Sequence, residues 1–443
     1  MPHPAIRFMT LDPGHFHAAL VHGEMYPDVS DRVDVFAPVD ADLVAHLHRL
    51  AGFNHRAARP TSWAWEVHAG PDGFARMLAE RPGTVVVLSG RNRVKIDQIL
   101  GAVEGGLHVL ADKPWVLRSE DLPKLEAALA EADARGLVAY DIMTERFEAT
   151  HRLQRAFVND TATFGQILPG RPDEPSVYME SVHFLKKMVA GAPNLRPTWF
   201  FDTGEQGEGL NDVGTHLVDL VQWTLFPDQA IDAATDIRLL DAMRWPTSIA
   251  EADFRSVTGA GFPPDLADHV ADGHLDYDCN TLVSYALRGI HVSLNVIWDW
   301  EPTDTPGDTH FAFYRGSRSR IDVRQTAADC FRPELYIVPA GGERAQVRAA
   351  AAAKVASLQQ EYPGIAIADA GDDIRVTIPE ALRVGHEAHF GEVTKAFLGY
   401  LRDRSALPAW ERPNMLAKYY VTTHGTEMSR QRAPQTAPRR APK

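Results

Sequence analysis

Asp212, His216 and Asp219 are the residues whose types and spacing in this chain best suit proton-transfer chemistry. The apolar residues that follow them repeat with the period of an amphipathic helix. At spacings of four and three residues, side chains share one face of a helix. An acid, a titratable base and a second acid would then face the same way. The same pattern also fits a helix cap at Asp212 and a buried structural histidine at position 216.

The elements expected in the first part of the chain alternate between strand and helix. Thr84–Ser89 is apolar and mostly β-branched, which is typical of a strand buried on both faces. Repeated strand–helix–strand order predicts a doubly wound parallel sheet of the Rossmann-like class. The predicted strands are 6–11, 33–39, 84–89, 106–111 and 136–140, and the predicted helices include 15–23 and 119–135, with Ser119 as the cap of the latter.

The pattern changes after residue 146. Alternating strand signals predict a second, α+β domain with a mostly antiparallel sheet. We therefore expect a dinucleotide-binding domain over 1–146 and a substrate-binding, catalytic domain over 147–428. Residues 341–372 are expected to form an insertion, and 429–443, rich in basic residues and proline, a disordered tail.

Composition excludes several classes of protein. With 443 residues, 45% of them hydrophobic and 23% charged, the chain is expected to be globular with two domains. A net charge of −14 argues against nucleic-acid binding, and no apolar run is long enough to span a membrane. Two cysteines are too few for a disulfide framework, and the first residues lack a signal-peptide pattern. These features predict a cytoplasmic protein.

The turn after the first strand departs from the usual dinucleotide fingerprint. A sheet of this class normally carries G-x-G-x-x-G here, with glycines that let the backbone approach the pyrophosphate. The chain has Asp12-Pro13-Gly14 instead, and only Gly14 stands where a fingerprint glycine belongs. This is a strong turn signal, so a rebuilt turn is expected. Asp40 is a candidate for the ribose hydroxyls, which favours NAD over NADP, but it also fits a surface acid.

Two segments resemble the glucose–fructose oxidoreductase / inositol 2-dehydrogenase / MocA (Gfo/Idh/MocA-like) family. Residues 105–114, Gly-Gly-Leu-His-Val-Leu-Ala-Asp-Lys-Pro, are similar to that family's G-K-H-V-L-x-E-K-P, with aspartate in place of glutamate. Residues 212–219 match its D-x-G-x-H-x-x-D, and 89–92 occupy the place of its T-P-N loop. The chain resembles a variant of this family that lacks the glycine-rich fingerprint.

The resemblance implies roles for particular residues. Lys113 would hydrogen-bond the reacting hydroxyl and position the nicotinamide, His216 would act as the general base, and Asp212 would orient it. Asp219 is expected to brace the helix. The expected cofactor-binding residues are Asp12, Gly14, His15, Phe16, Asp40, Ser89, Asn92, Asp112 and Lys113, and the expected substrate-binding residues are His183, Lys186, Asp212 and His216. A solvated charged turn explains Lys186 as well, and no metal is expected.

Three functions fit these features. The first is an NAD(P)-dependent oxidoreductase that acts on a secondary hydroxyl of a sugar, polyol or sugar derivative. The second is a redox-neutral glycoside-cleaving or lyase enzyme that retains NAD. The third is a non-catalytic sugar-binding protein. The expected cofactor is NAD, with NADP as the alternative. The expected partners are a carbohydrate-like small molecule and a second copy of the chain, with no nucleic acid and no membrane.

Overall fold

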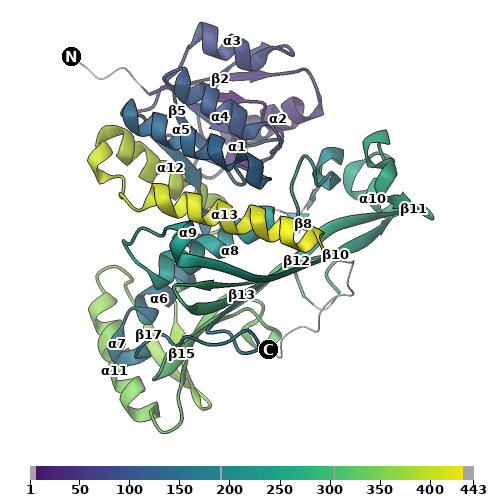
Figure 1. The fold of residues 1–443 in the computed structure, drawn as a ribbon. Helices are drawn as coiled ribbons and strands as arrows, with labels where there is room; N and C mark the ends of the chain where they lie inside the picture. The colour runs from purple at the N-terminus through teal and green to yellow at the C-terminus, as the bar shows by residue number, and fades with distance from the viewer. Residues whose placement is uncertain (1–5, 190–191, 304, 433–443) are drawn as a thin grey trace. The chain divides into compact units, whose positions relative to one another are not determined.

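The computed structural model describes residues 6–189, 192–303 and 305–432, and the chain divides into two units (Figure 1). Unit 1 comprises Met1–Thr144, Gly204–Gln206 and Gly385–Tyr419. Unit 2 comprises Glu145–Thr203, Gly207–Val384 and Tyr420–Lys443. Each unit therefore combines segments that are far apart in the sequence, and the last boundary falls inside a helix.

A parallel sheet of six strands forms the centre of unit 1. Its strand order is β3-β2-β1-β4-β5-β6, the order of a doubly wound fold. The middle strands consist mostly of buried apolar residues, and Val86 and Val87 in β4 are completely buried. The strands are β1 (Phe8–Leu11), β2 (Arg32–Ala37), β3 (Ala64–Ala69), β4 (Val85–Leu88), β5 (His108–Asp112) and β6 (Ala139–Ile142).

The helices of unit 1 pack on this sheet and on one another. The helix α3 contacts β1 and β2, α4 contacts β5 and α5, and α12 contacts β6 and α1. Their apolar side chains and those of the strands form one core cluster around Trp115. The helices are α1 (His17–Leu20), α2 (Ala41–His55), α3 (Gly73–Glu80), α4 (Lys95–Glu104), η1 (Ser119–Asp121), α5 (Leu122–Ala134), α12 (His386–Arg402), η7 (Arg404–Ala406) and α13 (Glu411–Arg430), whose residues after 419 belong to unit 2.

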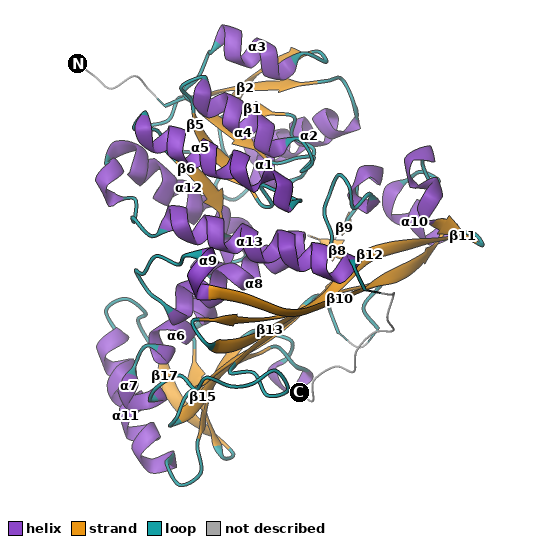
Figure 2. Ribbon diagram, viewed as in Figure 1, coloured by secondary structure: helices purple, strands orange, loops and turns teal. Residues whose placement is uncertain are grey.

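Unit 2 contains a sheet of ten strands, shown in orange in Figure 2. Along the path β10-β12-β13-β7-β14-β15-β16-β18-β17, every pair is antiparallel except β13 with β7. The strands are β7 (Val177–Phe184), β10 (Ile237–Ala250), β11 (Val270–Ala271), β12 (His274–Leu287), β13 (Ile290–Asp299), β14 (Thr309–Arg315), β15 (Ser319–Arg324), β16 (Glu334–Pro339), β17 (Ala366–Ala370) and β18 (Asp373–Thr377), with a separate pair β8 (Met188–Val189) and β9 (Ala192–Pro193).

The helices of unit 2 contact the sheet from several segments. The long helix α8 contacts β7, β12 and β13, and α6 contacts β15, β16 and α8. The helical elements are η2 (Thr144–Phe147), α6 (Ala149–Val158), α7 (Thr161–Phe164), η3 (Thr198–Phe201), α8 (Gly209–Leu225), α9 (Ala233–Asp236), α10 (Glu251–Thr258), η4 (Pro264–His269), η5 (Ala327–Asp329), α11 (Arg344–Leu358) and η6 (Glu380–Leu382).

The predicted fold class is confirmed in both parts, whereas several boundaries were wrong. The helix predicted over 15–23 is shorter and spans only His17–Leu20. The carbonyls of His15 and Phe16 accept hydrogen bonds from the amides three residues later, so the α-helix does not extend back to His15. Ser119 is not a cap; α5 begins at Leu122, where Pro123 is favoured in the first turn. Residues 341–372 contribute α11, which contacts α7, and β17, which pairs with β18. Of the predicted tail, 433–443 lie outside the described residues.

Among the described helices, none combines the length and the apolar character needed to cross a membrane.

Two buried histidines make the stability of unit 1 sensitive to acid. Burial, followed by the charge of a neighbour, lowers the pKa of both His22 and His46 to about 3. The unfolded chain binds a proton at each of them below pH ~6.5, but the folded chain does not. The free energy of unfolding is therefore highest above this pH and falls as the pH decreases from 6.5 towards 3. Each histidine contributes a slope of about 1.4 kcal/mol per pH unit within the window.

Replacement of His46→Leu should flatten this acid dependence. Neither ring nitrogen of His46 has a hydrogen-bond partner among the described residues, so leucine also relieves a buried polar group. Urea unfolding between pH 4.5 and 7.5 measures how the free energy of unfolding depends on pH. Below pH ~6.5 the slope of this dependence should be smaller by about 1.4 kcal/mol per pH unit, the amount that one proton contributes. His48→Leu, on the exposed face of the same helix, is the matched control and should leave the slope unchanged. An equal slope in both variants would contradict the assignment.

Candidate active site

The residues expected to react belong to different units. Lys113 and the expected cofactor-binding residues lie in unit 1, and Asp212 and His216 lie in unit 2.

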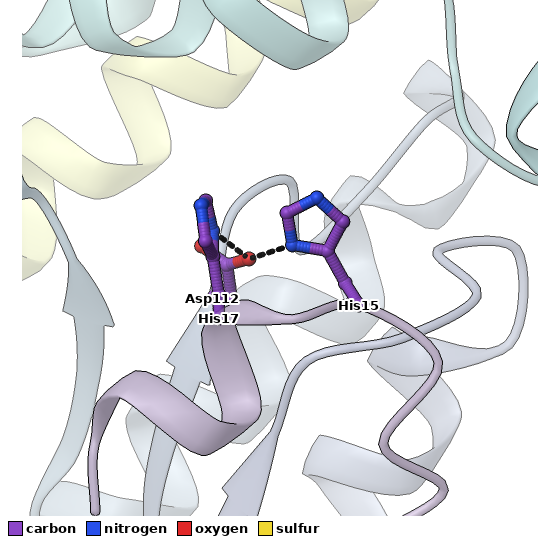
Figure 3. A group of neighbouring side chains, drawn as sticks. All are labelled: His15, His17 and Asp112. Atoms are coloured by element: carbon purple, nitrogen blue, oxygen red, sulfur yellow. Dashed lines mark hydrogen bonds and ion pairs between the residues drawn. The ribbon is translucent and has the colours of Figure 1, made fainter. Parts of the chain in front are cut away.

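The carboxylate of Asp112 is the centre of the group in unit 1. Asp112 is the last residue of β5, and Ser89 follows β4 directly. Because parallel strands end at one edge of the sheet, these residues meet there with the turn after β1. His17 Nδ1 lies 2.8 Å from Asp112 Oδ2, Ser89 Oγ donates to the same oxygen at 3.0 Å, and His15 Nδ1 lies 3.6 Å from it. Figure 3 shows both imidazoles facing this carboxylate.

Charges near Asp112 keep it ionised. Burial opposes ionisation, but the charge and hydrogen bond of His17, followed by the charge of Lys113, hold the pKa of Asp112 well below its usual range. Burial and the charge of His17 also hold the pKa of His15 well below its ordinary value. At neutral pH the group therefore contains a carboxylate beside a neutral His15 imidazole.

A buried lysine that the sequence did not single out fixes the end of β5. The side chain of Lys95 is 1% exposed, and its ammonium donates to the carbonyl oxygens of Asp112 (3.0 Å) and Pro114 (3.2 Å) and to Asn92 Oδ1. The half-buried Lys113 lies between them, with its amide donating to Asp112 Oδ1 at 3.0 Å. The backbone that carries Lys113 is thus held on both sides. Lys95 lies on a helix among apolar residues, and only the fold shows that it is buried.

The turn after β1 is rebuilt, as expected from Asp12-Pro13-Gly14. Asp12 has a left-handed backbone with φ of 43°. Its amide donates to Phe36 O, that of Gly14 to Asp12 O and that of His15 to Ser89 O, while Pro13 has no amide hydrogen. A side chain at Gly90 would overlap the Asp12 carbonyl, so the β4 loop packs directly on this turn. Residues 12–15 therefore do not form the usual amide cradle for a pyrophosphate.

The remaining cofactor-binding candidates lie at the same edge or after β2. The Phe16 ring packs against those of His15 and His17, with centroids 4.6 and 4.4 Å apart. Asn92 donates to Gln206 O at 2.8 Å and so holds the segment 204–206. Asp40 follows β2 and caps α2, with Oδ1 accepting from the Leu43 amide at 3.0 Å.

The surface around Asp40 is apolar. Val39 and Val44 are 79% and 64% exposed, and they line a shallow hollow together with Asp40. Burial raises the pKa of Asp12. The charge of Arg91 opposes this rise, and the charge of Asp40 adds a smaller one. A ligand with an apolar ring and hydroxyl groups fits this combination of valines and carboxylate.

Asp212 and His216 lie in the first two turns of α8 in unit 2. Asp212 is buried and His216 half-buried, and the cap position belongs to Glu208. Asp212 is therefore not the helix cap. Gly209 allows the helix to approach β12, because a side chain there would overlap the Cys279 carbonyl oxygen. This close approach sets the position of the acid and the imidazole on the sheet.

Two buried arginines fix the surroundings of Asp212 and Asp219. Arg146 binds Asp219 through two hydrogen bonds of 2.6 Å, so Asp219 braces α8 as expected. The buried Arg196 donates to the carbonyls of Leu185 and Phe184 at 3.1 Å and lies over the ring of Trp298. Burial lowers the pKa of Arg196, while the nearby Tyr277, Asp308 and Asp212 oppose this shift. No motif or spacing in the sequence pointed to either arginine.

The expected substrate residues separate into two environments. His183 contacts Asp308 at 3.1 Å and Ser181 at 2.8 Å and packs on Trp298, in the group that surrounds Arg196. Burial opposes ionisation of Asp308, but the charge of His183 and its hydrogen bond hold the pKa of Asp308 far below its usual range. Lys186 instead forms an exposed pair with Glu301 at 2.7 Å, which favours the solvated-turn interpretation.

The chain is similar to known oxidoreductases in sequence and in structure. A family model described as "Putative oxidoreductase C terminal domain" matches residues 153–430. A structure described as a "putative oxidoreductase from Parabacteroides merdae" is 44% identical, with a TM-score of 0.93, covering 96% of this chain and 98% of that chain. The chain belongs to this oxidoreductase family. No curated protein matches it.

More distant structures share the fold of this family member. A 3-ketoreductase from Actinomadura kijaniata, in complex with NADP and TDP-benzene, is 15% identical with a TM-score of 0.55, over 94% of this chain and 95% of that chain. A "putative myo-inositol dehydrogenase from Sinorhizobium meliloti" is 14% identical with a TM-score of 0.54, over 96% and 98%. At these identities the likeness shows the fold alone.

Replacement of Arg146→Ala should destabilise unit 2 strongly. It leaves the Asp219 carboxylate buried without its guanidinium, which costs about 3–5 kcal/mol in comparable buried pairs. Urea unfolding at pH 7 should show this loss. The control Arg171→Ala removes an exposed pair with Asp173 and should cost less than about 1 kcal/mol. A small loss for Arg146→Ala would contradict a bracing role of the buried pair.

Proposed function

We propose that this protein is an NAD(P)-dependent oxidoreductase that transfers hydride between a nicotinamide cofactor and a secondary hydroxyl of a carbohydrate-like molecule. The observation that carries the proposal is the placement of Lys113 directly after the buried Asp112, at the carboxyl edge of a doubly wound sheet. Membership in an oxidoreductase family supports it. The match of residues 105–114 and 212–219 to two family motifs supports assignment to the Gfo/Idh/MocA group.

The residues at the strand ends suit a dinucleotide, although the turn after β1 lacks glycines. Asp40 would bind the ribose hydroxyls of the adenosine, beside the apolar surface of Val39 and Val44. Ser89 and Lys113 would flank the nicotinamide. When bound, this cofactor supplies the hydride acceptor or donor. Because the amides of residues 12–15 are occupied, we propose that the phosphates are held farther from this turn than in glycine-rich relatives.

The chain's own residues would handle the proton. His216 would accept the hydroxyl proton as hydride leaves the adjacent carbon, because an imidazole titrates near neutral pH. The buried Asp212, four residues earlier on the same helix face, would orient the ring and stabilise its protonated form. The ammonium of Lys113 would donate to the reacting oxygen and stabilise negative charge on it.

The substrate class is proposed from the group around Arg196 and from distant structures. Asp308, Ser181 and His183 offer several hydrogen-bonding groups beside the Trp298 ring, which suits a molecule with hydroxyls and an apolar face. The distant structures include a 3-ketoreductase in complex with TDP-benzene and a protein described as a "putative myo-inositol dehydrogenase". Association of two copies of the chain stays a prediction.

Replacement of Lys113→Ala or His216→Asn should abolish most of the turnover. Loss of either group removes proton transfer or charge stabilisation worth about a hundredfold or more in rate. The test screens polyols and sugars by the absorbance of reduced nicotinamide and then compares the variants on the best substrate. Lys124→Ala removes an exposed lysine paired with Asp97 and serves as the control. Unchanged turnover in both site variants, with the fold intact, would contradict the proposal.

Replacement of Asp40→Ser should weaken binding of NAD more than it destabilises α2. Serine retains an oxygen that can cap the helix, so stability should change by less than about 1 kcal/mol. Loss of the carboxylate should lower the affinity for NAD about tenfold or more and reduce the preference for NAD over NADP. Calorimetric titration with both dinucleotides measures this. Equal NAD affinity in the two proteins would show that Asp40 serves only as a cap.

A further inference from the structure

The contacts between His15, His17 and Asp112 extend beyond what hydride transfer requires. One nitrogen of each imidazole and one carboxylate oxygen lie within 4.8 Å of one another. Both nitrogens face the same oxygen: His17 Nδ1 at 2.8 Å and His15 Nδ1 at 3.6 Å from Asp112 Oδ2 (Figure 3). Three donor atoms, two from the segment after β1 and one from the end of β5, thus converge on one point of unit 1.

This donor set matches that of a transition-metal site. Two imidazoles and one carboxylate, with a further position open, are the protein ligands of several catalytic zinc and iron centres. In a tetrahedral site, metal–ligand bonds of about 2.0–2.2 Å place neighbouring donor atoms about 3.4 Å apart. The two nitrogen–oxygen separations lie on either side of that value. The three donor atoms lie within 4.8 Å of one another, so side-chain rotations would bring them around one ion.

A buried polar atom points to a missing ligand. His15 Nδ1 is buried and has no hydrogen-bond partner among the described residues, although it faces a carboxylate. Burial of a polar atom without a partner costs free energy, so such atoms are rare. A cation bound between His15 and Asp112 would satisfy this nitrogen and the carboxylate together.

The surrounding groups hold the donors in place. The Lys113 amide donates to Asp112 Oδ1 and the Ser89 hydroxyl to Oδ2, which orients the carboxylate. The His17 ring packs against Phe390 of α12, with centroids 4.6 Å apart. The ammonium of Lys95 donates to the main-chain carbonyls of Asp112 and Pro114, which fixes the end of β5. Outer contacts of this kind fix the orientation of metal ligands.

We propose that His15, His17 and Asp112 bind a divalent transition-metal ion such as Zn²⁺, with at least one coordination position open to water or to a substrate oxygen. The ion binds at the edge formed by the ends of β1 and β5 and needs no dinucleotide. Such an ion would link the rebuilt turn to the end of β5.

The test measures metal binding by the full chain after treatment with a chelator. Calorimetry with Zn²⁺ should show one equivalent bound per chain, and Co²⁺ added in its place should give the visible absorption of an ordered site. His15→Ala removes one ligand whose nitrogen makes no hydrogen bond, so the fold should persist. Its Zn²⁺ affinity should fall at least about tenfold, because the loss of an outer-shell contact alone typically lowers metal affinity by this amount.

His48→Ala, at an exposed histidine of the same unit, is the matched control and should bind Zn²⁺ as the unmodified chain does. Absence of stoichiometric binding, or equal binding by the His15→Ala variant, would overturn the proposal; the latter would show that the ion binds elsewhere. Circular dichroism checks that the variants are folded. The readout uses neither dinucleotide nor turnover, so its failure is distinct from failure of the proposed oxidoreductase activity.

Discussion

The buried carboxylate of Asp112 is the interaction on which the candidate site of unit 1 depends. A charge removed from water is tolerated only when it is paired and hydrogen-bonded. Here the partners come from the turn after β1 (His17), the end of β4 (Ser89) and the chain after β5 (the Lys113 amide). Because leaving this charge without partners would cost free energy, its contacts keep the ends of β1, β4 and β5 together. Lys113, the next residue after Asp112, is positioned by this arrangement.

Unit 2 follows the same rule with arginine. Asp219 is buried and bound by Arg146, and the charge of Asp212 acts on the buried Arg196. Because Arg196 is also held by two main-chain carbonyls, it forms a fixed positive centre beside His183 and Asp308. The helix that carries Asp212 and His216 is thus held by a buried ion pair in addition to its apolar packing.

The sequence predicted the architecture and the two motifs but not the groups that hold them. Periodicity indicated the parallel strands and α8, because a strand buried on both faces and an amphipathic helix have distinct patterns. It could not indicate that Lys95, Arg146 and Arg196 are buried, since lysine and arginine are normally exposed and their partners lie far away in the sequence. For Lys186 it left two interpretations open, a substrate contact and a solvated turn, and the pair with Glu301 on the surface favours the second.

Native mass spectrometry of the purified chain, before and after addition of NAD and NADP, tests whether the protein binds a dinucleotide. We expect a mass increase of one dinucleotide per chain, either already present on purification or formed on addition. A cofactor already present would indicate retention, and one bound only on addition would indicate exchange. No adduct with either dinucleotide would mean that the turn of residues 12–15 has closed the site, and it would contradict the oxidoreductase assignment.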